Sequence, residues 1–273
     1  MFKAVLGKAV VAGAAFALIP AFAATKPAET AKAASPAAKA GPAAAKTKGK
    51  ATAKDKATAK AEKVDTTPGP LADFGKVDAS DDVVHVANWV SYTRNNRNRD
   101  FVVIDKKHAR MYVFDAKGKL KSDAPVLLGK AVGDDSAPGV GDKPLSQLKD
   151  EEKTTPAGRF LASHGRNTHG ADILWIDYKA AVSMHRVIKV GDENRFERLA
   201  SPEIDDNRIS NGCVNVPIAF YNSVLKPSVG KKGAYVYVLP ETRSVQKVFG
   251  SFDVTAKASG TQSADAKPAS TQQ

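Results

Sequence analysis

The sequence predicts a mainly β domain, a sandwich or a barrel, between about Asp81 and Phe252. Three observations support this fold class. Short segments rich in β-branched and aromatic residues recur along this part of the chain, and turn-forming residues separate them. Only two segments have apolar residues at the spacing that is typical of a helix. We therefore expect short strands, mainly antiparallel, with one or two short helices and low-complexity tails on either side.

The N-terminus has the pattern of a signal peptide. Lys3 and Lys8 form a basic start, an apolar stretch follows at 9–20, and residues 21–23 (Ala-Phe-Ala) form a small-x-small cleavage site. The apolar stretch is shorter than the roughly 20 residues of a membrane-spanning helix. We expect residues 1–23 to be removed on export; a buried or membrane-anchoring helix is the alternative.

A basic, low-complexity segment follows at 24–65. It contains ten Lys, four acidic residues and no aromatic residue, so it carries +6 of the chain's net charge of +12. Such a composition buries too little apolar surface to fold, and we expect a flexible tether. The tether is either a solvated spacer or a contact to an anionic wall or membrane surface. Nucleic acid is not expected as a partner of an exported chain.

The folded part begins with a lead-in at 66–100. Val86, Trp89 and Val90 predict a short helix over 83–92. The expected strands then follow at 101–105, 110–114, 125–128, 159–162, 173–178, 181–185 and 235–239.

The connections between these strands also have clear signatures. Residues 115–118 (Asp-Ala-Lys-Gly) predict a turn, and the Gly-, Pro- and Asp-containing stretch 129–153 predicts a long irregular loop. A second helix is expected over 216–225. The domain is expected to occupy 101–250, and a disordered polar tail is expected at 253–273.

Cys213 is the only cysteine, which excludes an intramolecular disulfide and a thiolate metal cage. It lies in the segment Ile209–Asn215 (ISNGCVN), where Gly212 permits a sharp turn before the second expected helix. A helix N-terminus lowers the pKa of a thiol, and its free N–H groups can stabilise an oxyanion. Composition leaves two readings open, a reactive nucleophile and a buried, inert thiol.

A thiol nucleophile needs a base, and five histidines are available: His85, His108, His164, His169 and His185. Strand alternation places His185 on one face with the small residues Ala181 and Ser183, which leaves room for a substrate. His164 and His169 flank a loop, and their spacing is only a weak sign of a metal site. Spacing alone does not choose among the histidines.

Three motifs, in this order, resemble the catalytic domain of the L,D-transpeptidases (the YkuD family): Thr155–Phe160 (TPAGRF), His185, and Ser210–Asn215 (SNGCVN). The resemblance extends over 101–239. It implies a β-sandwich-like fold and a cysteine acyltransferase that acts on peptidoglycan stem peptides, with no cofactor and no metal.

The resemblance also implies roles for individual residues. Cys213 would be the nucleophile and His185 the general base. The backbone N–H groups of Gly212 and Cys213 would bind the oxyanion, and Ser210 and Asn215 would support the loop.

The sequence departs from the family at two places. Asn211 replaces the histidine that usually precedes the Gly-Cys pair, in a position that helps to shape the site. The stretch 186–209 is longer and more charged than usual, and we interpret it as an insertion over the site, either a substrate lid or a solvated loop.

Four further residues are candidates for substrate binding. Arg186 and Arg208 are suited to hold a stem-peptide carboxylate, because a guanidinium binds a carboxylate through two hydrogen bonds. Trp175 and Tyr178 would line a groove, unless they belong to the core.

The implied reaction is release of D-alanine from a tetrapeptide stem and formation of a 3→3 crosslink. Water as the acceptor would make the protein an L,D-carboxypeptidase, and another amine would give an attached protein or an exchanged D-amino acid. A catalytically inactive wall-binding module is the alternative from another class. The signal peptide and the wall chemistry together favour the periplasm.

Overall fold

The computed structural model describes residues 67–258. The expected signal peptide at 1–23 and tether at 24–65 lie outside the described residues, as does most of the expected tail at 253–273. Within the described part, no helix combines the length and the apolar character that crossing a bilayer requires.

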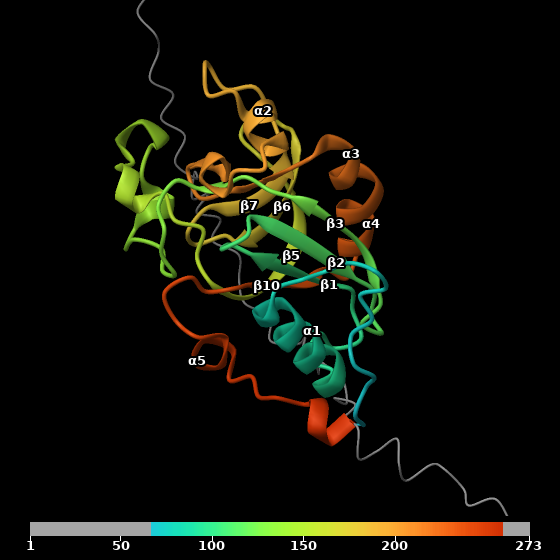
Figure 1. Cartoon of the computed structure of the whole chain (residues 1–273). Helices are drawn as coiled ribbons and strands as arrows, with labels where there is room; N and C mark the ends of the chain where they lie inside the picture. Colours follow the sequence, from blue (N-terminus) through green and yellow to red (C-terminus); the bar gives the residue numbers. More distant parts are fainter. Residues whose placement is uncertain (1–66, 259–273) are drawn as a thin grey trace, which may run out of the picture. The chain divides into compact units, whose positions relative to one another are not determined.

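A mixed eight-stranded sheet organises the described chain (Figure 1). Strands β1 and β10 pair in parallel, as do β7 and β9, and the other neighbours are antiparallel. The expectation of a mainly β fold is confirmed. In spatial order the strands are β3 (Leu120–Pro125), β2 (Arg110–Phe114), β1 (Phe101–Asp105), β10 (Ala234–Val238), β5 (Gly158–Arg166), β6 (Asp172–Asp177), β7 (Val182–Arg186) and β9 (Val214–Val216).

The two edges of this sheet come close to meeting. Leu127, which follows the edge strand β3, exchanges two backbone hydrogen bonds of 2.9 Å with Asn215 on the opposite edge strand β9. A short parallel pair, β4 (Leu128–Gly129) and β8 (Arg208–Ser210), continues from this point. The sheet therefore curls toward a barrel, and the residues around Cys213 lie at its seam.

Two apolar clusters occupy the two faces of the sheet. The alternate side chains of the strands, such as Val102, Met184 and Val236, form one cluster together with residues of the C-terminal helical segment such as Tyr221. The other cluster packs Val83, Val86 and Val90 of α1 (Asp81–Thr93) against Phe101 and its neighbours on the opposite face. Period-2 alternation explains how one strand serves both clusters.

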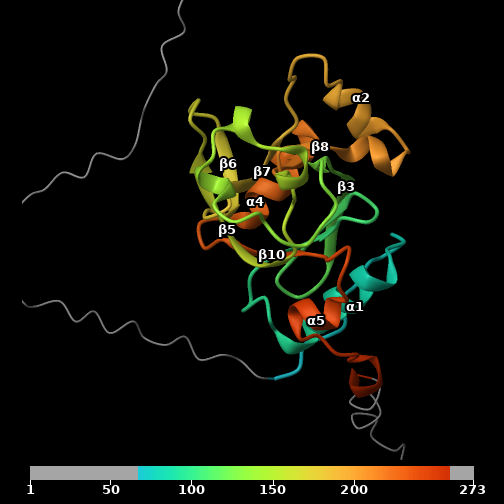
Figure 2. The same ribbon diagram turned by 90° about the vertical axis from the view of Figure 1, so that its left-hand side faces the viewer.

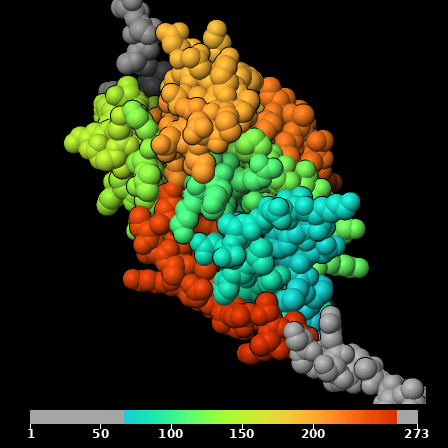
Figure 3. Space-filling model, in the orientation of Figure 1, coloured from blue at the N-terminus to red at the C-terminus, as the bar shows by residue number. Residues whose placement is uncertain are grey.

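The lead-in and the C-terminal segment cover the same face of the sheet. Figures 2 and 3 show α5 (Val245–Phe249) and the chain after it beside α1. Val254 is 1% exposed in this cluster, so the packed chain extends past residue 253, where we expected the disordered tail to begin. The tail prediction placed that boundary too early because residues 253–273 are mostly polar and small, which hides the single buried Val254.

The predicted helix over 83–92 lies within α1. Ser80 caps its N-terminus by accepting a hydrogen bond from the Val83 N–H at 3.4 Å, and Asp81 and Asp82 occupy the first turn, where carboxylates favour the helix dipole. Arg94, in the left-handed conformation, ends the helix.

Two predicted elements are shifted, and β5 extends four residues past the predicted end of its strand, to Arg166. The third strand is β3 at Leu120–Pro125 and not 125–128, because its sequence LKSDAP is polar, as suits an edge strand, and lacks an apolar signal. The second helix begins at Ile218, since Val216 still belongs to β9 and Pro217 follows it. It runs through α3 (Ile218–Phe220), a π-helical turn (Tyr221–Leu225) and α4 (Lys226–Val229).

The loop predicted over 129–153 contains three single 3-10 turns, η1 (Val140–Asp142), η2 (Leu145–Gln147) and η3 (Asp150–Glu152), and no strand beyond Gly129. The stretch 186–209 folds into α2 (Arg195–Ala200) and η4 (Ile204–Asn207). The sequence analysis missed α2 and η4 because these two elements are short and largely polar.

Candidate active site

Cys213 lies in a tight turn between β8 and β9. Gly212 has a φ of +116°, which other residues rarely adopt, and a Cβ there would stand 2.9 Å from the Thr154 carbonyl oxygen. The expectation of a thiol at a helix N-terminus is wrong, because three strand residues and Pro217 separate Cys213 from Ile218. The helix dipole therefore does not explain the reactivity of the thiol.

Cys213 and His185 lie on adjacent parallel strand segments. His185 is the register partner of Asn215, and Met184 is the partner of Val214, so the residue preceding β9 lies beside Ser183. The Ser183 hydroxyl donates to the Cys213 sulfur at 3.5 Å, and the sulfur is 3.6 Å from the Ala181 carbonyl oxygen. The predicted face of small residues around His185 thus receives the thiol.

His185 acts directly on the ionisation of the thiol. Burial is the largest single cause and raises the pKa of Cys213, but the interactions of the thiol with His185 and, to a smaller extent, with Ser183 together outweigh it. The net effect is a pKa below the ordinary value. Cys213 and His185 are both partly exposed, so a ligand can reach the pair.

The backbone fixes the orientation of the imidazole. His185 Nδ1 lies 2.7 Å from the Arg186 carbonyl oxygen. A carbonyl oxygen only accepts hydrogen bonds, so Nδ1 carries a proton and Nε2 is the nitrogen left to accept the thiol proton.

Side chains on both sides hold the Cys213 turn. The Ser210 hydroxyl donates to the Cys213 carbonyl oxygen at 2.6 Å and accepts from the Gly212 N–H at 3.1 Å. The Asn215 amide also donates to the Cys213 carbonyl oxygen, at 3.2 Å. Ser210 and Asn215 therefore both hold the carbonyl group of Cys213. Asn211 is exposed.

One expected oxyanion donor is already in use. Because the Gly212 N–H donates to Ser210, it is not free to bind an oxyanion, and the expectation for Gly212 is corrected. The Cys213 N–H is the remaining backbone candidate of the expected pair.

The insertion at 186–209 packs against this turn. Arg195 of α2 is 7% exposed, pairs with Glu193 at 2.5 Å and donates to the Asn215 side-chain oxygen at 2.9 Å. In Figure 3 the amber atoms around α2 form one end of the visible face. A fully solvated loop is therefore excluded for this part of the insertion.

Arg186 and Arg208 are engaged within the protein. Arg186 pairs with Asp172 at 3.0 Å and lies over the Tyr221 ring, and this pairing lowers the pKa of Asp172. The Arg208 side chain is 12% exposed and pairs with Glu241. The expectation that these arginines are free to hold a substrate carboxylate is wrong, because both guanidinium groups already have carboxylate partners.

Trp175 and Tyr178 do not belong to the core. Trp175 is the register partner of Ser183, which places it on the same face as the thiol, and its indole lies over Gly165, where no Cβ intervenes. Tyr178 is 79% exposed, and the two rings meet edge to face at 5.1 Å. A pocket of about 320 Å³ adjoins the turn between β6 and β7, next to Ala181; it is lined by residues 136–140, 142, 177, 179 and 180.

The other histidines lie elsewhere. His164 and His169 are exposed, His108 pairs with Asp105 at 2.8 Å, and His85 bonds to Ser251 at 3.0 Å. Among residues 67–258 no group of three or more His, Cys, Asp or Glu side chains is arranged to hold a metal ion.

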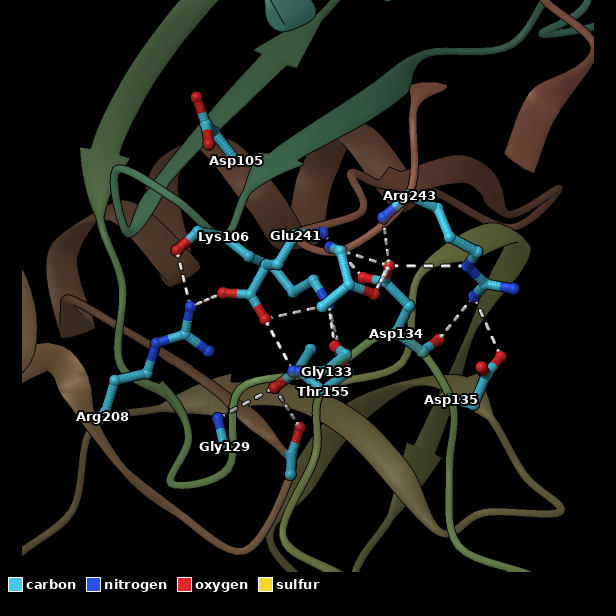
Figure 4. A network of polar contacts seen from close by, with 12 residues as sticks. Asp105, Lys106, Gly129, Gly133, Asp134, Asp135, Thr155, Arg208, Glu241 and Arg243 are labelled. Carbon is cyan, nitrogen blue, oxygen red and sulfur yellow. Dashed lines mark hydrogen bonds and ion pairs between the residues drawn. The ribbon is translucent and has the colours of Figure 1, made fainter. Parts of the chain in front are cut away.

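Sequence reasoning missed a buried charged cluster beside the Cys213 turn, shown in Figure 4. Its centre is Lys106, which is 0% exposed. The segment Asp105–His108 looks like an ordinary polar turn, so no local signal identifies Lys106 as a buried residue. Its partners Asp134 and Glu241 are far away in the sequence.

Comparison with known proteins finds partial matches among solved structures. No family profile and no curated protein sequence matches the chain. Of 14 matching chains among solved structures, one is the L,D-transpeptidase from Xylanimonas cellulosilytica DSM 15894, with 17% sequence identity and a TM-score of 0.32. The match covers 52% of this chain and 60% of that chain.

Proposed function

We propose that the protein is a peptidoglycan L,D-transpeptidase that uses Cys213 as its nucleophile. The observation that carries the proposal is the strand register that brings Cys213 beside the face of β7 that holds Ser183 and His185, where the Ser183 hydroxyl bonds to the sulfur and His185 lowers the pKa of the thiol. The order of the three sequence motifs adds the substrate class. The inactive alternative is disfavoured because Asn211, the altered motif residue, is exposed, while Cys213 and His185 keep adjacent places in the strand register.

The geometry supports a two-step acyl transfer. His185 Nε2 takes the thiol proton, and the sulfur attacks the carbonyl carbon between the third and fourth residues of a tetrapeptide stem. The Cys213 N–H stabilises the resulting oxyanion. As the C–N bond breaks, His185 returns the proton to the amine of the departing D-alanine, and a thioester remains on Cys213.

The second step repeats this chemistry in reverse. A side-chain amine of a neighbouring stem attacks the thioester, His185 accepts its proton, and the sulfur leaves as thiolate. An amide that links two third-position residues is the product. The partly exposed ring of Trp175 and the exposed ring of Tyr178 are the candidates for contacting one of the two stems.

The direct test is incubation of the protein with a disaccharide-tetrapeptide, followed by mass spectrometry of the products. We expect released D-alanine and 3→3 dimers from the wild type and neither from C213A, with equal folding of both proteins by circular dichroism. Tripeptide without dimer would assign the protein as an L,D-carboxypeptidase. No D-alanine release with any amine acceptor would overturn the proposal.

We also propose that the protein acts in the periplasm, on the basis of the basic, apolar and small-residue pattern at 1–23. Cell fractionation with the natural N-terminus, compared with a chain that starts at residue 24, tests this localisation. Retention of the full chain in the cytoplasm would contradict it.

A further inference from the structure

Lys106 forms the centre of a buried polar cluster that reaches the Cys213 turn. Its ammonium group donates to the Thr155 carbonyl oxygen at 3.0 Å, to the Gly133 carbonyl oxygen and to Asp134 at 3.2 Å. Glu241 lies 3.3 Å away. The three N–H donors of the ammonium group thus face four acceptor groups of the protein, two backbone carbonyls and two carboxylates (Figure 4).

Thr155 connects this cluster to the nucleophile. Its side chain is fully buried, and its hydroxyl donates to the Gly212 carbonyl oxygen at 2.8 Å while accepting from the Gly129 N–H at 2.9 Å. Lys106 therefore holds the main chain of Thr155, and the side chain of Thr155 holds the peptide that joins Gly212 to Cys213.

The held carbonyl determines where the next N–H points. A trans peptide is planar, so the Cys213 N–H is directed opposite to the Gly212 carbonyl oxygen. With the Gly212 N–H bonded to Ser210, this N–H is the oxyanion donor in the mechanism proposed above. We infer that Lys106 and Thr155 are positioning residues, which aim the Cys213 N–H at the developing oxyanion; the inference rests on the proposed acyl transfer.

The positioning of the Cys213 N–H also depends on the positive charge of Lys106. The groups that face it are Asp134 and Glu241, and Arg208 and Arg243 lie close enough to oppose its charge. Burial is the largest cause that lowers the pKa of Lys106, to about 8, while Asp134 raises it and the two arginines lower it further. A neutral amine has only two donors, so above this pH its lone pair faces one of the enclosing oxygen atoms and the hold on Thr155 weakens.

Two reagents that react with the Cys213 thiol separate a loss of oxyanion positioning from a general loss of thiol reactivity. Acylation by p-nitrophenyl acetate passes through an oxyanion: the sulfur bonds to the acetyl carbon and p-nitrophenolate leaves. Alkylation by iodoacetamide displaces iodide and forms no oxyanion. Both reactions use the same thiolate, so the ratio of their rates cancels changes in thiol ionisation; circular dichroism checks that each variant is folded to the same extent.

We expect T155V to lower the acylation-to-alkylation ratio by about tenfold or more, because a small misplacement of a catalytic donor costs rates of this order. T155S, which keeps the hydroxyl, should restore most of the ratio. The control Y237F removes another buried hydroxyl, which donates to Asn95 at 2.7 Å in the opposite apolar cluster, and should leave the ratio unchanged. An equal ratio in T155V and the wild type would overturn the inference.

A pH series tests Lys106 in the unmodified protein. The wild-type ratio should be constant near pH 7 and fall as the pH rises through about 8. A ratio that stays flat up to pH 10 would exclude Lys106 from the positioning role. These outcomes do not depend on peptidoglycan: if p-nitrophenyl acetate reveals the T155V defect but no stem peptide reacts, the proposed substrate fails and the positioning inference stands.

Discussion

Arg195 donates a hydrogen bond of 2.9 Å to the side-chain oxygen of Asn215, two residues after the cysteine. The same Asn215 donates its amide to the Cys213 carbonyl oxygen. The inserted segment at 186–209 is thereby connected to the nucleophile through one asparagine. Its contribution is structural support from outside the sheet, in addition to the support that Ser210 gives from within the turn.

The variant R195M tests this connection. It removes a buried charged donor and leaves Glu193 and Asn215 without it, so we expect a loss of about 2 kcal/mol in the free energy of unfolding. Alkylation of Cys213 should also slow, since the turn loses a support. Urea denaturation and iodoacetamide kinetics measure the two effects. The matched control is R198M in the same helix, where the side chain is 35% exposed and a smaller loss is expected.

The thiol–imidazole pair predicts a shifted ionisation. Because His185 lowers the pKa of Cys213, the alkylation rate of the wild type should reach half of its maximum below pH 9.0, and H185Q should move this midpoint upward. Acyl transfer should fall at least about 100-fold in H185Q through loss of the general base. H164Q, the same change at an exposed histidine, serves as the control. A midpoint that is identical in H185Q and the wild type would contradict the pairing.

Gly212 should tolerate no side chain. G212A combines a φ of +116° with a Cβ that would meet the Thr154 carbonyl oxygen at 2.9 Å, so we expect a loss of about 3 kcal/mol in stability and of most thiol reactivity. G170A is the matched control, because Gly170 also has a positive φ but open space around it, and about 1 kcal/mol is expected there. Equal losses in thermal unfolding would show that the contact with Thr154 is unimportant.

Lys106 should make stability depend on alkaline pH. Its pKa is about 8 in the folded protein and 10.5 as the reference value, so between these values the unfolded chain binds more protons. The free energy of unfolding therefore rises with pH in this window, by up to about 3 kcal/mol from this group. Comparison of the wild type with K106M by urea denaturation at several pH values isolates this slope. A constant difference between the two proteins from pH 8 to 10.5 would contradict a buried lysine with a lowered pKa.

This slope has the opposite sign to the expected change in reactivity. Acylation relative to alkylation should decline over the same pH window in which the cost of burying the Lys106 charge is relieved. Stability and the rate ratio measured on the same samples therefore separate the two effects of this lysine.

Local sequence patterns were enough to predict the bounds of an element where one pattern dominates its segment. Strands β1 and β2 were predicted at their observed bounds, because each is a run of apolar residues next to a turn. The face shared by Ser183 and His185 followed from alternation alone. Strand β3 was displaced because a polar edge strand has no such pattern.

The candidate site was predictable only in part, because several of its contacts join distant residues. Nothing near Lys106 in the sequence indicates that Asp134 and Glu241 enclose its charge, and nothing near Arg208 indicates that Glu241 is its partner. A basic residue in a polar segment normally lies in solvent. The free guanidinium groups expected at Arg186 and Arg208 were wrong for this reason.

The pair of hydrogen bonds between Leu127 and Asn215 joins the chain that follows the edge strand β3 to the opposite edge strand β9, two residues after the cysteine. Parting of those two bonds would leave Asn215 held only from the side of His185 and Arg195, so the support of the Cys213 carbonyl would rest more heavily on Ser210. We expect such a local opening to cost less than global unfolding, and hydrogen exchange at the Leu127 and Asn215 amides would report its rate.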